Sequence, residues 1–91
     1  MEEYRDKSGR LSIELSDDDR QFGMFAKRLE KFGGRPKEKL DGLDQRYWDF
    51  EVNGVTVVLH SDPMVGVSIH VEDGSHDGLL RSVAAACLGE K

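Results

Sequence analysis

The sequence predicts an α+β fold, a two-layer sandwich in which two helices cover one face of a four-stranded, mostly antiparallel sheet. Two segments carry apolar residues at helical spacing, four shorter segments alternate apolar and polar residues, and this alternation leaves the sheet with one apolar face. The expected element order is β-α-β-β-β-α. Residues 1–9 are charged and lack a period, so we expect a flexible tail, followed by a single α+β domain over residues 10–91.

The first strand and the first helix follow one another directly. Residues 11–15 alternate apolar and polar side chains, which is typical of a half-buried strand. Ser16 is placed to cap the helix, and three aspartates follow it where the helix dipole favours negative charge. Gly33 suits the C-terminal stop of this helix, and residues 34–44 are expected to form a polar loop. The apolar stripe of the helix consists of Phe22, Phe25, Ala26, Leu29 and Phe32.

A three-stranded meander is predicted over residues 47–71. Asn53-Gly54 is the strongest hairpin signal in the chain, because both turn residues need positive φ. In the register that this turn sets, the apolar pairs are Val52 with Val55, Phe50 with Val57, and Trp48 with Leu59. A second turn at residues 62–64 returns the chain. Pairing Ser61 with Val65 across it places Leu59 opposite Val67.

Two expectations complete the fold. The first strand, the first helix and the strand that begins at residue 47 should form a βαβ unit, whose strands are parallel and joined by a right-handed crossover. Residues 75–89 predict the second helix, with Ser75 or Asp77 as its cap. The residues expected on its inner side are Leu79, Leu80, Val83, Ala84, Cys87 and Leu88.

Composition excludes several classes of protein. The 91 residues include 13 basic and 18 acidic ones, a net charge of −5, which disfavours nucleic acid as a partner. No apolar run is long enough to span a bilayer, and the first residues lack the apolar stretch of a secretory signal. A single cysteine permits no intramolecular disulfide. We therefore expect a cytoplasmic protein without a membrane partner.

Positive charge is concentrated in residues 27–39. This segment holds six basic residues and two acidic ones, a local charge of +4, and its candidate binding residues are Arg35, Lys37 and Lys39. It has three interpretations: a solvated helix end and loop, a docking site for an acidic protein, or an RNA contact. A phosphate loop is not supported, because the glycines follow the end of a helix and not the end of a strand.

The sheet face away from the helices is the other candidate site, and it is either a solvated surface or a binding face. Its candidate residues are Tyr47, Val58, His60 and His70. In the expected register His60 opposes Gly66 and His70 opposes Thr56, an offset of four residues, or about 13 Å. One metal ion cannot bridge that distance. We find no catalytic constellation, no metal site and no cofactor motif in the sequence.

The string "YWDFEVNGVTVVLHSDPMVGVSIHVED", residues 47–73, carries a family resemblance. Its motif is an aromatic residue before Phe-Glu, a glycine turn, a leucine strand, a short turn and a Ser-Ile strand. It resembles small uncharacterised bacterial βαβββα domains and is similar to certain immunity proteins of polymorphic toxin systems. The resemblance implies this fold and a non-enzymatic role, and it assigns no functional residue.

Three functional hypotheses follow. The first is a non-catalytic protein-binding module, immunity-like or an adaptor, which uses the open sheet face, a sheet edge or the basic segment 27–39. The second is a small ligand-binding or enzymatic domain around Tyr47, His60 and His70, which needs a homodimer to close a pocket. The third is an RNA-associated factor that uses the basic segment.

Overall fold

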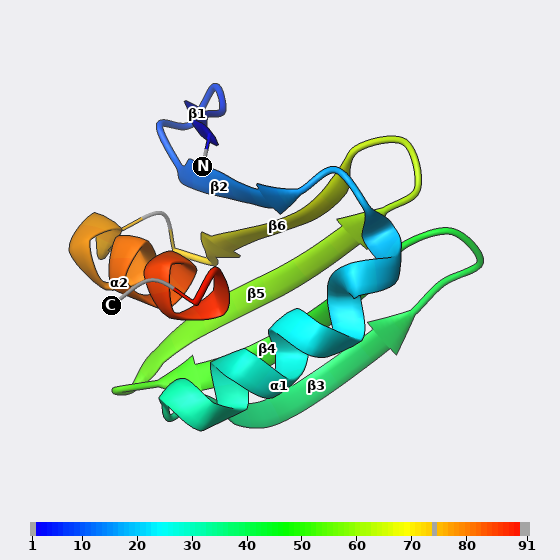
Figure 1. The fold of residues 1–91 in the computed structure, drawn as a ribbon. Helices are drawn as coiled ribbons and strands as arrows, with labels where there is room; N and C mark the ends of the chain where they lie inside the picture. The colour runs from blue at the N-terminus through cyan, green and yellow to red at the C-terminus, as the bar shows by residue number, and fades with distance from the viewer. Residues whose placement is uncertain (1, 74, 90–91) are drawn as a thin grey trace.

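The structure, a computed structural model, describes residues 2–73 and 75–89. Its elements are β1 (Glu2–Arg5), β2 (Leu11–Ser16), a 3-10 turn (Asp19–Gln21), α1 (Phe22–Phe32), β3 (Arg35–Asp41), β4 (Arg46–Val52), β5 (Val55–Asp62), β6 (Gly66–Val71) and α2 (Asp77–Cys87). The strands form one six-stranded sheet in the order β1-β2-β6-β5-β4-β3 (Figure 1). Every neighbouring pair in this sheet is antiparallel.

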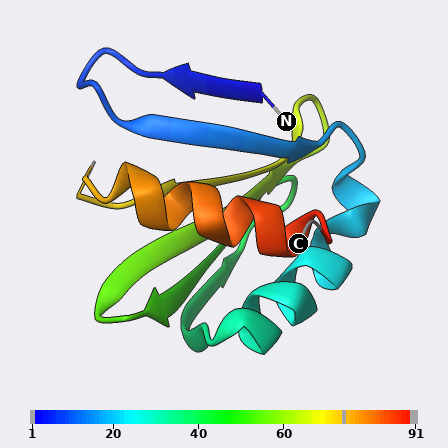
Figure 2. The ribbon, with the colours of Figure 1, turned by 60° about the vertical axis from the view of Figure 1, so that its left-hand side comes forward.

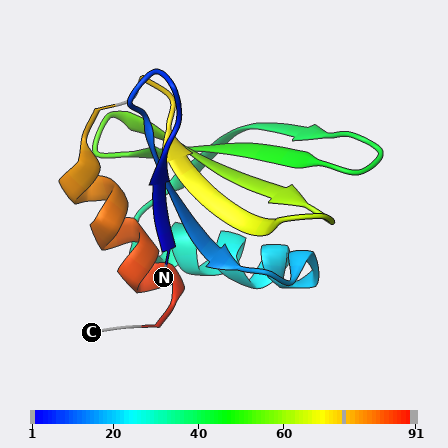
Figure 3. The same cartoon turned by 90° about the horizontal axis from the view of Figure 1, so that it is seen from above.

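Both helices lie on the same side of the sheet (Figure 3). α2 packs over β2 and β6, and α1 packs beside α2 and over β5 (Figure 2). The core between the two layers consists of apolar side chains from the helices and from β2, β4, β5 and β6. No described element packs against the opposite side of the sheet, which we call the open face.

The expected four-stranded sheet is wrong in size, although the α+β class fits. β1 lies within residues 1–9, where a tail was expected, and β3 lies within residues 34–44, where a loop was expected. Every residue of these two strands is exposed. Neither strand therefore shows the apolar alternation that identified the other four. Backbone pairing with β2 and with β4, respectively, holds them in the sheet.

The place of β2 also differs from the prediction. We expected it to run parallel to β4, but β2 pairs antiparallel with β6, where Ile13 lies opposite Ile69, and it runs antiparallel to β4. Because each step across the sheet reverses direction, β2 runs parallel to β3, with three strands between them. α1 therefore connects β2 to β3 and not to β4. β3 pairs with β4 on the side away from β5.

The β4–β5 hairpin has the predicted register. Val52 lies opposite Val55, Phe50 opposite Val57, and Trp48 opposite Leu59. Asn53 and Gly54 form the turn with φ values of 51° and 78°.

The β5–β6 register differs from the prediction by two residues. Asp62 pairs with Gly66, so that Leu59 lies opposite Ile69 and not opposite Val67. The turn is built on Asp62, whose carbonyl accepts from the N–H of Val65 at 3.1 Å. Its side chain also accepts from the N–H of Met64 at 2.8 Å. These bonds close a three-residue loop over residues 63–65, one position later than the loop that the sequence predicted.

α1 begins later than predicted. Asp18, and not Ser16, caps the 3-10 turn before it, by accepting from the N–H of Arg20 at 3.0 Å. Ser16 ends β2, and its hydroxyl donates to Gln21 Oε1 at 2.6 Å. The helix ends as predicted at Gly33, whose φ is 121°.

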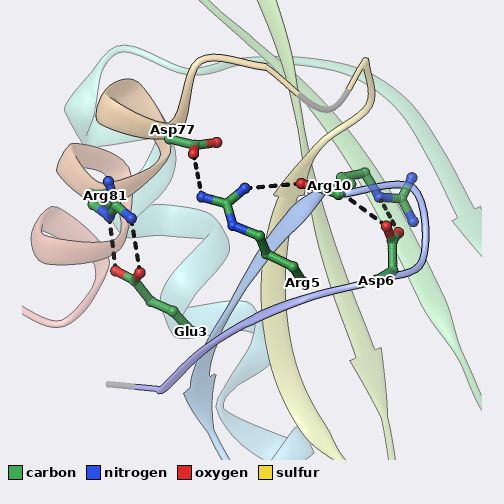
Figure 4. Close-up of polar contacts among 7 residues, drawn as sticks. Glu3, Arg5, Asp6, Arg10, Asp77 and Arg81 are labelled. Carbon is green, nitrogen blue, oxygen red and sulfur yellow. Dashed lines mark hydrogen bonds and ion pairs between the residues drawn. The ribbon is translucent and has the colours of Figure 1, made fainter.

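α2 is shorter than predicted, and neither proposed cap is used. His76 occupies the N-cap position with a φ of 66° and no side-chain cap bond. Asp77 instead accepts a bond from β1, since Arg5 Nη2 lies 2.6 Å from its Oδ2 (Figure 4). Glu3 makes a second ion pair with α2. Arg81 Nε donates to one oxygen of its carboxylate at 2.9 Å, and Arg81 Nη2 donates to the other at 3.0 Å. β1 is thus fastened to α2 by charge and not by apolar packing.

Substituting glycines with positive φ gives the first prediction. A Cβ at Gly66 (φ 110°) would stand 2.0 Å from the backbone oxygen of Ser16, whereas a Cβ at Gly54 (φ 78°) meets nothing within 4 Å. Gly54→Ala should lower the free energy of unfolding by about 1–2 kcal/mol through backbone strain alone. Gly66→Ala adds a backbone clash and should cost more than about 3 kcal/mol. Urea denaturation measures both, and equal losses would contradict the close contact between β6 and the end of β2.

Candidate functional site

The open face consists of side chains in three rows that cross the strands in register. The first row, in strand order, is Glu2, Glu14, Ser68, His60, Tyr47 and Leu40. The second row is Tyr4, Ser12, His70, Val58 and Asp49. The third row is Thr56, Glu51 and Arg35. Small residues form the buried middle of this face, namely Ser12, Val58 and Ser68.

Tyr47 and His60 form an ordered pair at the centre of the first row. Their rings are stacked, with centroids 4.3 Å apart and planes 10° from parallel. Tyr47 Oη donates to Gln45 Oε1 at 2.6 Å, and His60 Nε2 lies 3.1 Å from the same oxygen. Because that oxygen only accepts, His60 carries its proton on Nε2. Burial lowers the pKa of His60, so the ring is neutral at pH 7.

His70 lies in the second row, directly opposite Val58. The sequence predicts that it lies opposite Thr56, and the displacement of the β5–β6 turn by one position accounts for the difference. His70 is half-buried, and this burial, with the nearby positive charge of Arg10, lowers its pKa to about 4. His70 is therefore a neutral side chain at pH 7.

His60 and His70 are closer than predicted. They lie on neighbouring strands, diagonally offset by two residues and not by four, so the distance argument against a shared metal no longer holds. Within residues 2–73 and 75–89, however, no group of three or more His, Cys, Asp or Glu side chains is arranged to hold a metal ion. Two imidazoles alone leave a metal site incomplete.

The basic residues of β3 are divided between the two faces of the sheet. Arg35 is on the open face, where its guanidinium lies 3.7 Å from Glu51. Lys37 is on the same face, with Nζ 3.4 Å from the hydroxyl of Thr56. Both side chains therefore contact the third row of the open face.

Lys39 lies on the helix side of the sheet. Its Nζ sits 4.3 Å from the centroid of the Trp48 ring, a cation–π contact. Lys27 and Lys31, from the same basic segment, are exposed on α1. The segment 27–39 is thus divided between the two sides of the sheet and does not form one positive surface.

The sequence analysis missed Glu2 and Tyr4 of this face, which lie where a tail was expected, and also missed Gln45 and Leu40. Gln45 lies in the connection between β3 and β4, where no pattern marks its role as the acceptor for Tyr47 and His60. Leu40 lies beside Tyr47 on β3. Its position would follow from strand alternation if the segment had been identified as a strand.

Several other types of site find no support among the described residues. Cys87 is buried, and burial raises the pKa of its thiol to about 11, so it is not a thiolate at neutral pH. None of the five main cavities is lined by Tyr47, His60 or His70. No helix in residues 2–73 and 75–89 has the length and apolar character needed to cross a membrane.

Compared with protein-family models, with curated proteins and with solved structures, the chain gives no match. The function is therefore argued from the open face itself.

The low pKa of His70 predicts a loss of stability in weak acid. The unfolded chain takes up a proton near pH 6.5, whereas the folded chain does so only near pH 4, so stability falls as the pH drops through this window. His70 is partly exposed, and solvent reduces the effect. The free energy of unfolding should therefore fall by roughly 1 kcal/mol between pH 7 and pH 5.

Urea denaturation of His70→Gln at both pH values tests this directly, because the variant should lose much less. His76→Gln, at an exposed histidine, is the matched control and should behave as the wild type does. An unchanged acid loss in His70→Gln would contradict the prediction.

Proposed function

We propose that this protein is a non-catalytic protein-binding module that binds its partner through the open face. The observation that carries the proposal is the stacked Tyr47–His60 pair, which Gln45 holds in place although 37% of Tyr47 is exposed. Tyrosine is enriched among the residues that dominate protein interfaces. A side chain that is already ordered loses little conformational entropy when a partner binds.

The surroundings of this pair support the same function. Leu40, next to Tyr47, is 65% exposed, and Tyr4 at the far side of the second row is 47% exposed. Between them lie Val58 and Ser68, whose small side chains are buried in the middle of the face. Exposed apolar and aromatic side chains around a closely packed floor are typical of a protein interface.

The two edges of the sheet are poorly suited to binding a partner by strand addition. β3 carries Pro36, two lysines and a register irregularity between Pro36 and Lys39, all of which hinder pairing with a further strand. The opposite edge is β1, which has only four residues. The open face is therefore preferred over an edge.

Neither alternative hypothesis has comparable support. A ligand-binding or enzymatic domain around Tyr47, His60 and His70 needs a pocket, and no main cavity reaches these residues. An RNA-associated factor needs a continuous basic surface, and the basic residues of segment 27–39 are divided between the two sides of the sheet.

We further propose that the module is immunity-like or an adaptor and acts in the cytoplasm. Its resemblance to immunity proteins of polymorphic toxin systems supports the first point. The single cysteine, which is free and buried, suits a reducing compartment.

A photo-crosslinking amino acid tests the binding face in the full chain. With benzoylphenylalanine in place of Leu40, we expect a specific protein to be crosslinked in the native lysate. With the same group in place of Met24, which is exposed on α1, we expect that product to be absent. Adding Tyr47→Ala to the Leu40 probe should reduce the yield about tenfold, because an interface tyrosine contributes more than about 1.4 kcal/mol.

The unfolding midpoint of each variant confirms that it is folded. A product that forms equally well without the Tyr47 ring, or that forms from position 24, would refute binding through the open face.

A further inference from the structure

We infer that the partner segment on the open face is basic: it crosses the strands with a lysine or arginine over Glu2 and Glu14 and an apolar side chain over Tyr47. This inference rests on the proposed function and names the chemistry of the partner.

The first row of the open face ends in two acidic side chains, on β1 and β2. Glu2 and Glu14 lie directly opposite one another on β1 and β2, and both point to the open face. Like charges in this position destabilise a sheet. Among residues 2–73 and 75–89, neither glutamate belongs to an ion pair. A cation from outside the fold would remove this repulsion.

The other side of β1 shows the contrast. There Glu3 pairs with Arg81, and Arg5 pairs with Asp77, so both charged side chains that face α2 have a partner of opposite sign (Figure 4). The same short strand therefore has matched charges where it contacts its own fold and unmatched charges where it faces outward.

A shallow cavity marks the place for one basic side chain. It has a volume of about 260 Å³ and is lined by Glu2, Glu14, Leu15, Ser16 and Asp17. Three of these residues are acidic and none is basic. A lysine or arginine that enters it would bring its cation to the carboxylates.

Further negative charge lies in the second row. Asp49 is partly buried, and burial together with the carboxylates of Glu72 and Glu38 raises its pKa, although Lys37 acts in the opposite direction. Acidic side chains therefore occur at both sides of the face, although Arg35 and Lys37 add positive charge at the β3 side. At the end that Glu2 and Glu14 form, phosphate groups would be repelled, which favours a basic protein over RNA.

The spacing of the strands sets the length of the partner segment. Three strand intervals separate β2 from β4, which corresponds to about 14 Å. An extended chain covers this distance in about four residues. The basic and the apolar residue of the partner should therefore stand about four positions apart.

A display library of random 12-residue peptides, selected on the full-length chain, tests the inference. Selected peptides should be net positive, with an apolar residue about four positions from a lysine or arginine. Synthetic copies should bind Glu2→Gln/Glu14→Gln about tenfold more weakly than the wild type, and they should bind Tyr47→Ala more weakly as well. Raising NaCl from 50 to 500 mM should weaken wild-type binding more than binding by the double variant.

Glu30→Gln/Asp44→Asn is the matched control, because it removes the same charge at exposed positions outside the three rows. Peptides affected equally by both double variants would show only an effect of net charge and would overturn the inference.

The remaining outcomes separate the inference from the proposed function. Peptides that depend on Tyr47 but not on the two glutamates refute the basic partner and leave the binding face intact. Peptides whose binding changes neither with Tyr47→Ala nor with Glu2→Gln/Glu14→Gln refute binding at this face. Selection of acidic peptides, or of no peptides, refutes the basic partner. A wild-type dimer in sedimentation that Tyr47→Ala converts to a monomer would mean that a second copy occupies the face, and the inference would be wrong.

Discussion

The burial of one apolar face of β4, β5 and β6 is the constraint on which the rest of the structure depends. Side chains alternate between the two faces of a strand, so the register that buries Phe50 and Leu59 also turns Tyr47 and His60 outward. A slip of one residue would exchange the two sets and expose the core. The Asn53-Gly54 turn fixes this register, and the composition of the open face follows from it.

At the β1 edge of the sheet, ion pairs replace apolar packing as the contact with the helices. The edge strand β1 buries no side chain, so backbone pairing with β2 holds it in the sheet and its ion pairs connect it to α2. Such exposed pairs contribute little energy individually, but the bidentate Glu3–Arg81 contact gives them direction. Because β1 is held from one side, its other side needs no favourable charges for folding. That freedom allows Glu2 to stand opposite Glu14.

The predictable parts of the structure are those in which a local pattern determines the outcome. The β4–β5 register follows from one turn and three apolar pairs, and it places Tyr47 beside His60 as predicted. β1 and β3 were missed because wholly exposed strands carry no apolar alternation. The error at β2 follows from missing β3, and the error at His70 follows from the position of the turn after Asp62. Gln45 lies outside any periodic element, so only the folded structure brings it to the two rings.

The fold needs some residues of the sheet and does not need others. The core accounts for the inward side chains, and the lysines and proline of β3 are accounted for as protection of an edge. Tyr47 and His60 contribute no burial to that core, yet a shared hydrogen-bond acceptor orders them. Glu2 and Glu14 oppose the pairing of the strands that carry them. Residues that are ordered or unfavourable without benefit to the fold, and that share one row of one uncovered face, are explained most simply by a partner that contacts that row.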